Sequence, residues 1–333
     1  MQNDSKCVIA SCVSGLCNAI STLVISTIVA NHLGRPLYVY WIDGFIANDV
    51  QLLDIFEISS SNKSKILTTE EYGNVCNTTK MIRFCDPHAH ELDFKNNIDP
   101  GPYLRIFHYN NLNEISEIPS IQNHDIYICE PQIPAFIKPG HLKVFFDLFL
   151  IKQEHLAQVN NFISQHKCTH GIHIRGTDIL SMTQYTLDDI KQFVDDMIHK
   201  IVSNGVTKGT SPVFICSDDE NVENMFRDNK LIAMFEKEYV YRRDTNQSWF
   251  LHSGSEHINK SKDLEHNGKL YKSFATCNMV RSTKQVIGGW IDLLTLAHLS
   301  NIDGFITSQT STYFAFAKLL HTFLHQNKNP KIL

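Results

Sequence analysis

The sequence lacks the cysteine and histidine spacings that are typical of a zinc site or a disulfide framework. Its nine cysteines are dispersed, no two of them form a C-x-x-C pair, and the 17 histidines are scattered as well. An odd number of cysteines without a recognisable secretory signal favours free thiols in a reducing compartment. We therefore expect a cytoplasmic protein that needs no metal ion.

Strong charge of either sign is also missing. The chain has 30 Lys and Arg residues against 35 Asp and Glu residues, which gives a formal net charge of -5. The basic residues are spread along the chain, and only Arg242 and Arg243 are adjacent. A nucleic-acid interface needs basic residues gathered on one face, so we expect no nucleic-acid partner.

The sequence has few features of a membrane anchor. Residues 8–29 are rich in apolar side chains, but Ser11, Asn18 and Ser21 interrupt them, whereas a spanning helix needs about 20 mostly apolar residues. A signal peptide would begin with positive charge, and only Lys6 precedes this stretch. We therefore expect no membrane span.

What the first forty residues do show is the order strand, turn, helix, strand. These elements are a buried strand at 7–13, a tight turn at 14–18, a helix at 19–32 closed by Gly34, and a strand at 37–41. Such a βαβ unit predicts a parallel, doubly wound sheet. Gly15 in the turn lets backbone approach a ligand closely. Because the turn lacks G-x-G-x-x-G, a role in turn geometry alone is equally open.

Strands and helices alternate more regularly further along the chain. Strands are predicted at 126–129, 171–175, 213–216 and 304–307, and helices at 144–159, 187–203, 221–227, 290–299 and 313–325. Pro131, Pro134, Pro139 and Gly140 cluster between the halves. We therefore expect an α/β protein with domains at 1–138 and 139–333.

The stretch CTHGIHIRGTD at 168–178 carries the most specific chemistry. Its alternating pattern predicts a short strand that delivers His173, Arg175 and Asp178 to its carboxyl end. Ligands of open α/β sheets bind beyond such ends, and the planar guanidinium of an arginine can hold two phosphate oxygens. An ordinary salt-bridged strand end is the alternative.

Two further strands are predicted to end in polar residues. Ser217, Asp218 and Asp219 follow one of them, and Ser308, Thr310 and Ser311 follow the other. Polar ends that converge on one sheet edge indicate a site for a nucleotide sugar or another phosphate.

Four stretches resemble the fucosyltransferase superfamily that includes the α1,2-, core α1,6-, nodulation-factor and protein O-fucosyltransferases. SGLCNAI at 14–20 resembles its G-x-x-N turn, and HIRGTD at 173–178 its H-x-R-x-x-D motif. FICSDDENV at 214–222 is similar to its strand ending in S/T-D-D. The stretch 290–320 is similar to its closing helix, strand, Ser/Thr turn and helix. The resemblance implies a GT-B fold, with two facing Rossmann-like domains and parallel sheets.

The resemblance also implies roles for single residues. In the family the motif arginine holds the diphosphate of GDP-fucose, which implies this role for Arg175, while Asp178 is a candidate catalytic base. The hydroxyl-rich turn contacts phosphate, and an acidic residue, here Asp292, meets the guanine edge. The donor-binding residues implied are His173, Asp218, Asp292, Ser308, Thr310, Ser311 and Thr312, and those implied on the acceptor side are Gly15 and Asn18.

The activity that this implies is inverting, metal-independent transfer of fucose from GDP-fucose to a hydroxyl of a glycan or a polypeptide, with no cofactor. The chain departs from the family pattern at Gly176, where several members have a second arginine, and at Thr183, where some have a glutamate. These departures keep two alternatives open. One is a non-catalytic protein that binds a nucleotide sugar or glycan, and the other is a transferase that uses another GDP-sugar.

Overall fold

The protein is described here by a computed structural model. It describes residues 6–12, 16–41, 50–78, 81–85, 103–130, 132–175, 185–203, 211–237, 242–243, 264–266, 269–271, 279–280, 283–305 and 311–327.

The chain divides into two compact units, each built from separate stretches of sequence. Unit 1 contains Met1–Asp54, Ile58–Leu150 and Val240–Thr283, and unit 2 contains Ile55–Glu57, Ile151–Tyr239 and Lys284–Leu333. The domain boundary between residues 138 and 139 stays a prediction. Unit 1 runs on through helix α5 (Leu142–Leu148), because α5 packs against α1 (Leu16–Leu33) of the same unit.

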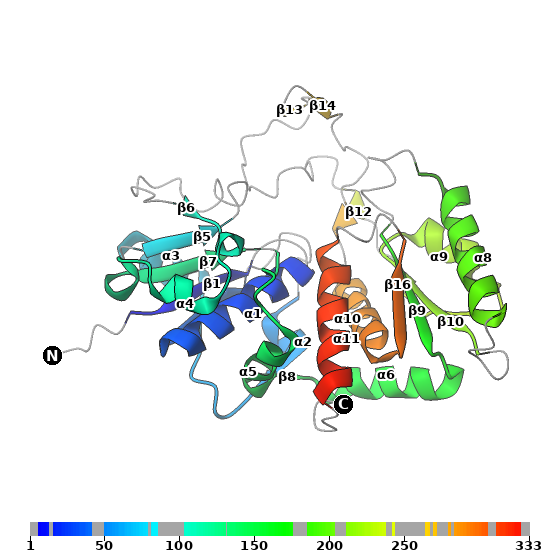
Figure 1. Cartoon of the computed structure of the whole chain (residues 1–333), viewed down its shortest axis with the longest axis horizontal. Coiled ribbons are helices and arrows are strands. Elements are labelled where there is room, and N and C mark those ends of the chain that lie inside the picture. Colours follow the sequence, from blue (N-terminus) through cyan, green and yellow to red (C-terminus); the bar gives the residue numbers. More distant parts are fainter. Residues whose placement is uncertain are drawn as a thin grey trace. The chain divides into compact units, whose positions relative to one another are not determined.

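Unit 1 is built around a parallel sheet, with the strand order β4-β2-β1-β7-β5-β6 in the part of the chain that is described (Figure 1). All of its pairs are parallel. Its strands are β1 (Val8–Cys12), β2 (Leu37–Trp41), β4 (Lys65–Ile66), β5 (Met81–Cys85), β6 (Tyr103–Leu104) and β7 (Asp125–Cys129). Every residue of β1 is buried, as expected of a central strand with both faces covered.

The helix that follows β1 begins earlier than the sequence predicts. Leu16, Cys17 and Asn18, which we had placed in a turn, form the first turn of α1. Gly34 lies after the last turn with φ +63, so the predicted glycine at the helix end is confirmed.

By length and composition alone, α1 could cross a membrane, and 72% of it is buried. Two of its threonine side chains find hydrogen-bond partners inside the fold. The Thr22 hydroxyl donates to the carbonyl of Glu130 at 2.9 Å. Thr27 donates to the carbonyl of Leu23 at 2.7 Å. Buried hydroxyls need such acceptors, and these two hydrogen bonds allow the helix to bury both threonines.

The other helical elements of this part of the chain are short. They are α2 (Leu52–Ile55), α3 (Thr69–Thr78), α4 (Leu112–Ser116) and the 3-10 turns η2 (Ile106–His108), η3 (Ile121–Asn123) and η4 (Pro139–His141). Under one face of the sheet, Tyr40 stacks on Tyr72 with ring centroids 3.8 Å apart. The Tyr72 hydroxyl lies 3.1 Å from that of Ser11 and 3.2 Å from that of Tyr127. The tyrosine rings therefore pack in the core, and the hydroxyls of Tyr72 and Tyr127 serve one another as hydrogen-bond partners.

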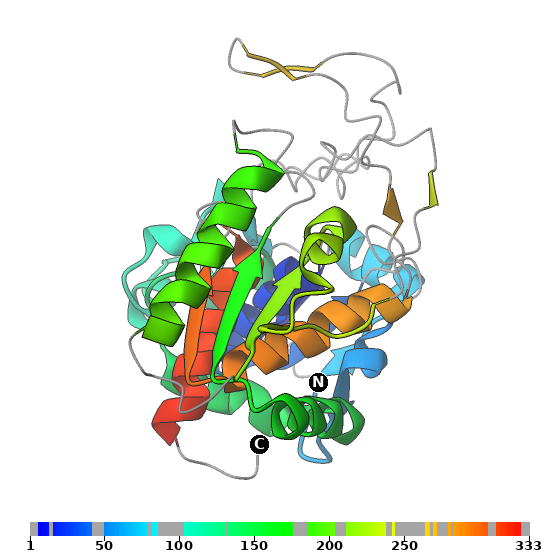
Figure 2. The same ribbon diagram turned by 90° about the vertical axis from the view of Figure 1, so that its right-hand side faces the viewer.

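Unit 2 is built around a second parallel sheet, with the strand order β11-β10-β9-β16 among the described residues (Figure 2). Its strands are β9 (His170–Ile174), β10 (Val213–Ser217), β11 (Ile232–Ala233) and β16 (Asn301–Gly304). Its helices are α6 (Gln153–His166), α8 (Leu187–Ser203), α9 (Glu220–Phe226), α10 (Thr283–His298) and α11 (Thr312–Asn327).

The helices of unit 2 lie on both faces of this sheet. Ile172 and Ile174 pack in one cluster with Ile190 and Val194 of α8, and Figure 1 shows α8 and α11 on opposite sides of the strands. On the other face, a Cβ on Gly171 would lie 2.7 Å from Leu296 of α10. This glycine therefore lets α10 approach the strand closely. Covered faces on both sides complete a Rossmann-like layer order.

The predicted helix at 144–159 is wrong in its continuity. Strand β8 (Phe149–Ile151) divides it into α5 and α6, with Phe149 and Ile151 buried and Leu150 exposed. This alternation of buried and exposed residues is typical of a strand. The apolar residues between 144 and 159 also recur at a helical period, which is why the sequence predicts one helix. The ring of Phe149 stacks on that of Phe145 at 5.3 Å, so packing decides the outcome.

The remaining strands are short. They are β3 (Phe56–Ile58), β12 (Arg242–Arg243), β13 (Leu264–His266), β14 (Lys269–Tyr271) and β15 (Met279–Val280). β12 pairs with β15 and β13 pairs with β14, both antiparallel. Between residues 242 and 268, the described residues therefore include strand segments.

Candidate functional site

Three parallel strands of unit 2 end at the same level. His173 of β9 lies opposite Cys216 of β10 and Gly304 of β16, and Ile174 lies opposite Ser217. The next residues along each strand therefore emerge at one carboxyl edge. This is the edge at which open α/β sheets bind ligands.

Arg175 and Asp218 are the polar residues that this register brings together. Each comes directly after its strand, and each is half-buried. Both act on the same imidazole: the Arg175 guanidinium lowers the pKa of His173, and the Asp218 carboxylate raises it. The two charges therefore lie close to the ring of His173, at the edge where the sequence predicts them.

His173 itself is only 4% exposed. Its ring stacks on Tyr313 of α11, with centroids 4.6 Å apart and planes inclined by 20°, and lies 5.8 Å from Phe314. Burial is the main reason why its pKa is lowered to about 4. The imidazole is therefore neutral at physiological pH and is held as an aromatic surface under the edge.

Gly304 explains how α11 reaches this histidine. A Cβ on Gly304 would lie 2.8 Å from the ring of Phe314. The missing side chain thus lets α11 pack directly on β16. The Tyr313 hydroxyl donates to the carbonyl of Gly289 in α10 at 2.7 Å, which fixes the ring that supports His173.

Most of the polar groups at the end of β10 form hydrogen bonds that stabilise the turn after this strand. The Ser217 hydroxyl donates to the carbonyl of Ile174 at 2.8 Å and accepts from the N–H of Asp219 at 3.1 Å. The Asp219 carboxylate caps α9 by accepting from the N–H of Asn221 at 2.8 Å. Of the three residues predicted at this end, Ser217 and Asp219 therefore hold the turn, while Asp218 follows the strand beside Arg175.

Asp292 lies in a buried ion cluster, which we call the Lys237 cluster and define as Lys237, Glu223 and Asp292. The Lys237 ammonium pairs with both carboxylates and donates to the carbonyl of Ser217 at 3.0 Å. The side chains of Lys237 and Asp292 are 4% and 2% exposed. Burial raises the pKa of Asp292 to about 7, with Glu223 adding to the rise and Lys237 opposing it.

Sequence reasoning missed the Lys237 cluster. Lys237 comes from the segment after β11, in a run with no motif, and its partners lie on α9 and α10. The stretch FEKEY offers no pattern that distinguishes this lysine from a solvated one. Only the three-dimensional crossing of β10, α9 and α10 reveals it.

The start of α11 belongs to the same carboxyl edge, because α11 is the helix that follows β16. Ser311 is 4% exposed, and its carbonyl accepts from the N–H of Ala315 at 2.9 Å. Thr312 is the first helical residue. The first N–H groups of this 16-residue helix have no partner within the helix, and they carry the positive end of its dipole.

The other predicted site residues are placed as follows. Asn18 lies half-buried in the first turn of α1 in unit 1. Gly15, Asp178, Ser308 and Thr310 lie outside the described residues. Among the residues that the structure does describe, no group of three or more His, Cys, Asp and Glu side chains could hold a metal ion.

Comparison with known proteins defines the fold. No protein-family model and no curated protein sequence matches the chain. Solved structures do match. The NodZ α1,6-fucosyltransferase soaked with GDP-fucose has a TM-score of 0.56 at 14% identity, over 95% of this chain and 93% of that one. The fucosyltransferase NodZ from Bradyrhizobium has a TM-score of 0.54 at 14% identity, over 96% and 94% of the two chains.

A further similar structure is POFUT1 in complex with GDP-fucose, with a TM-score of 0.48 at 11% identity over 96% of this chain and 94% of that one. The likeness to NodZ extends through both units of the chain. The protein therefore has the mixed α/β fold of the GT-B fucosyltransferases, with a parallel sheet in each of two Rossmann-like units. This fold was predicted from the sequence and is confirmed.

Proposed function

We propose that this protein is a glycosyltransferase that transfers fucose from GDP-fucose to a hydroxyl group of a glycan or a polypeptide, with inversion and without a metal ion or a cofactor. The observation that carries the proposal is the shared carboxyl edge of β9, β10 and β16. There Arg175 emerges beside the buried ring of His173. A GDP-sugar as donor agrees with the ligands named for the NodZ structures of the same fold.

The proposed chemistry follows from charge. When the bond between fucose and the diphosphate breaks, negative charge develops on GDP, and fixed positive groups lower the energy of that state. Arg175 supplies a guanidinium that can bind two oxygens at once. The N–H groups at the start of α11, behind Ser311 and Thr312, supply a second positive surface. Ser308 and Thr310 precede them in the sequence and are proposed to add hydroxyl contacts.

The other roles are assigned by the same resemblance. His173 is proposed to lie beside the diphosphate as a neutral ring, Asp218 to contact the donor, and Asp292 to meet the guanine. The acceptor hydroxyl attacks from the side opposite the leaving diphosphate, which gives inversion, and Asp178 is the candidate base for its proton. Gly15 and Asn18 are proposed to face the acceptor. A reducing, cytoplasmic setting and the absence of a nucleic-acid partner remain part of the proposal.

The experiment uses Arg175→Ala with Arg227→Ala as its control, because Arg227 is an exposed arginine of the same unit. GDP release from GDP-fucose is followed with a mixed glycan and peptide acceptor set, with and without EDTA, and GDP binding is measured by calorimetry. We expect Arg175→Ala to lose GDP affinity and turnover by about 100-fold or more. We expect Arg227→Ala and EDTA to have no effect.

Normal turnover in Arg175→Ala would contradict the assignment of the site. Tight GDP binding by the unaltered protein without release of GDP from any GDP-sugar would favour a non-catalytic binding protein instead, the alternative to which Gly176 points. Release from GDP-mannose but not from GDP-fucose would move the proposal to another donor sugar.

A further inference from the structure

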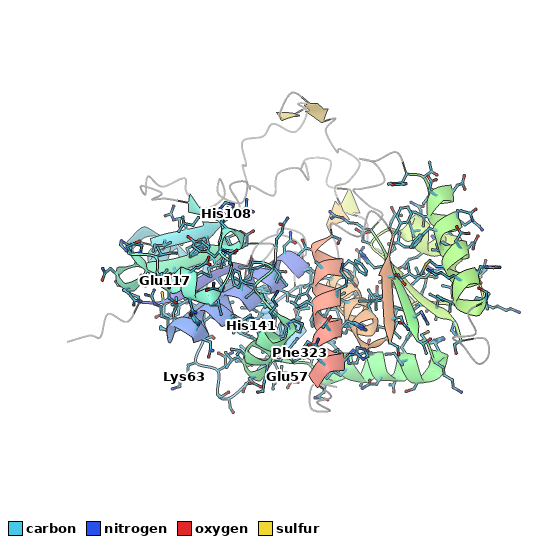
Figure 3. The ribbon with its side chains drawn as sticks, in the orientation of Figure 1. Glu57, Lys63, His108, Glu117, His141 and Phe323 are labelled. Carbon is cyan, nitrogen blue, oxygen red and sulfur yellow. The ribbon has the colours of Figure 1, made fainter. Side chains whose placement is uncertain are left out.

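Unit 1 contains a pocket that the proposed reaction does not use. Its volume is about 610 Å³, within the range of pockets that bind small ligands. We call it the α4 pocket, because Asn111, Leu112 and Asn113 at the start of α4 line it. Residues before η4 and the end of α1 complete the lining. His141, which Figure 3 labels, is one of the lining residues.

The ionisable side chains that line the α4 pocket are basic. They are His32, Lys138 and His141, and none of the described lining residues is acidic. Burial, then Lys138, then His32 lower the pKa of His141. Among the described residues, no carboxylate contributes to that shift. A like-charged cluster without a counter-charge in its lining favours an anionic ligand.

Glu114 of α4 is not among the described residues that line the pocket, and its carboxylate forms hydrogen bonds within α4 and the turn before it. Its oxygens accept from the N–H and the amide of Asn110 at 2.8–3.2 Å and from the amide of Asn111 at 3.1 Å. Glu114 also raises the pKa of Tyr109, after burial. The hydrogen bonds of this carboxylate are therefore directed to Asn110 and Asn111.

The basic groups present hydrogen-bond donors to the pocket. The backbone N–H of Lys138 donates to Nδ1 of His141 at 3.1 Å, so the neutral ring carries its proton on Nε2. The Lys138 ammonium donates one hydrogen to the carbonyl of Ala135 at 2.7 Å and has two more. The His32 ring lies 2.9 Å from the Ser116 hydroxyl, which keeps it on the pocket rim.

The remaining lining suits a sugar. The half-buried ring of Tyr109 is braced edge-to-face on Phe84, with centroids 5.8 Å apart, and Phe136 adds a second, buried ring. Asn113 supplies an exposed amide that can both donate and accept. Aromatic faces take the C–H surface of a pyranose, and amides bind its hydroxyls.

We propose that the α4 pocket is a second binding site, separate from the proposed donor site, and that it takes an anionic saccharide whose carboxylate, sulfate or phosphate lies among His32, Lys138 and His141. The sugar ring lies against Tyr109 and Phe136. The site needs no nucleotide and holds its ligand without transferring it.

The test uses saturation-transfer NMR and calorimetry on the full chain, with N-acetylglucosamine 6-sulfate as the probe. N-acetylglucosamine and inorganic sulfate are the matched halves of that probe. We expect the sulfated sugar to bind at least 10-fold more tightly than either half. Its affinity should rise as the pH is lowered below 7.5 and the ring of His141, whose pKa is lowered by burial, gains its proton. Glucuronic acid should compete with it.

Lys138→Gln and His141→Gln test the location, because both side chains lie at or near the surface. Each should weaken the sulfated probe about 5- to 10-fold and leave N-acetylglucosamine binding and GDP release unchanged. Lys143→Gln on the exposed face of α5 is the control and should change nothing. Equal affinity for the neutral and sulfated sugars, affinity for sulfate alone that equals that for the sulfated sugar, or binding that neither variant weakens would overturn the proposal. Absence of GDP release in the unaltered protein, with intact sugar binding, would count against the proposed transferase instead.

Discussion

The imidazole of His173 lies on the phenol ring of Tyr313, with ring centroids 4.6 Å apart and an angle of 20° between the planes. Tyr313 is tied in turn to the carbonyl of Gly289. A central strand and two helices therefore meet at one histidine. The motif residue that looked like a ligand from sequence alone is also part of the packing of unit 2.

The two roles of His173 can be separated by substitution. His173→Ala should destabilise the protein by about 2–4 kcal/mol, because it leaves a cavity under α11. His173→Phe keeps an aromatic ring in place and should cost less than about 1.5 kcal/mol. If His173 also serves the donor, His173→Phe should still weaken GDP binding. Urea unfolding and calorimetry measure the two effects, and unchanged GDP affinity in His173→Phe would limit this residue to packing.

Comparison of the unaltered protein with His173→Phe should reveal a pH dependence of stability. The folded pKa of His173 is about 4, below the value of about 6.5 in an unfolded chain. Between these values the unfolded state binds more protons, so the stability of the native protein falls as the pH is lowered from 6.5 to 4. His173→Phe lacks this contribution. The difference in unfolding free energy between the two proteins should therefore shift by about 3 kcal/mol in favour of the variant at pH 4.

Lys237→Met should be among the most damaging substitutions in unit 2. It leaves the carboxylates of Glu223 and Asp292 buried without their cation, which costs about 3–5 kcal/mol at pH 7.5. Acid should restore part of the loss, because protonation removes the uncompensated charge. Lys191→Met, which breaks an exposed pair with Asp195, should cost less than about 1 kcal/mol. Equal losses in the two variants would contradict a structural role for the Lys237 cluster.

Gly304→Ala should loosen the contact between β16 and α11. The new Cβ would lie 2.8 Å from the ring of Phe314, and overpacking of this kind costs about 1–3 kcal/mol. Gly289→Ala in α10 is the matched control, since nothing lies within 4 Å of a Cβ there. It should stabilise the protein by about 0.5–1 kcal/mol through helix propensity. Thermal unfolding should therefore give a lower Tm for Gly304→Ala and a higher Tm for Gly289→Ala than for the unaltered protein.

Asp292→Asn and Glu223→Gln test the guanine contact within the Lys237 cluster. Each substitution removes one carboxylate charge beside Lys237, but only Asp292 is proposed to meet the nucleotide base. A hydrogen bond to a charged group contributes about 1.5–3 kcal/mol, so Asp292→Asn should weaken GDP binding about 10-fold or more. Glu223→Gln should leave it near normal, and equal effects would point to the cluster rather than to a base contact.

The sequence predicted the central elements well, because they depend on local pattern. Strand β2 and helix α8 have the predicted bounds. A local cap begins α8: the N–H of Asp189 donates to the Thr186 hydroxyl at 3.3 Å, and the N–H of Thr186 donates to the Asp189 carboxylate at 2.7 Å. These signals lie within a few residues of one another.

What the sequence missed depends on contacts between distant residues. β16 lies earlier than predicted, at Asn301–Gly304, because its register is set by pairing with His170 to His173. α10 begins at Thr283, well before the apolar run that predicted it. The stacking of His173 on Tyr313 joins residues from opposite ends of unit 2. Periodicity along the chain carries no information about such pairs.

Phe56 belongs to unit 2 although it precedes most of unit 1 in the chain. Its ring meets that of Trp290 at 5.4 Å and 67°, and both side chains are completely buried. Severing the polypeptide near residue 150 would therefore not release two self-sufficient halves. In the downstream fragment the indole of Trp290 would lose its contact with Phe56. A synthetic peptide that contains Ile55–Glu57 would be needed to restore this contact.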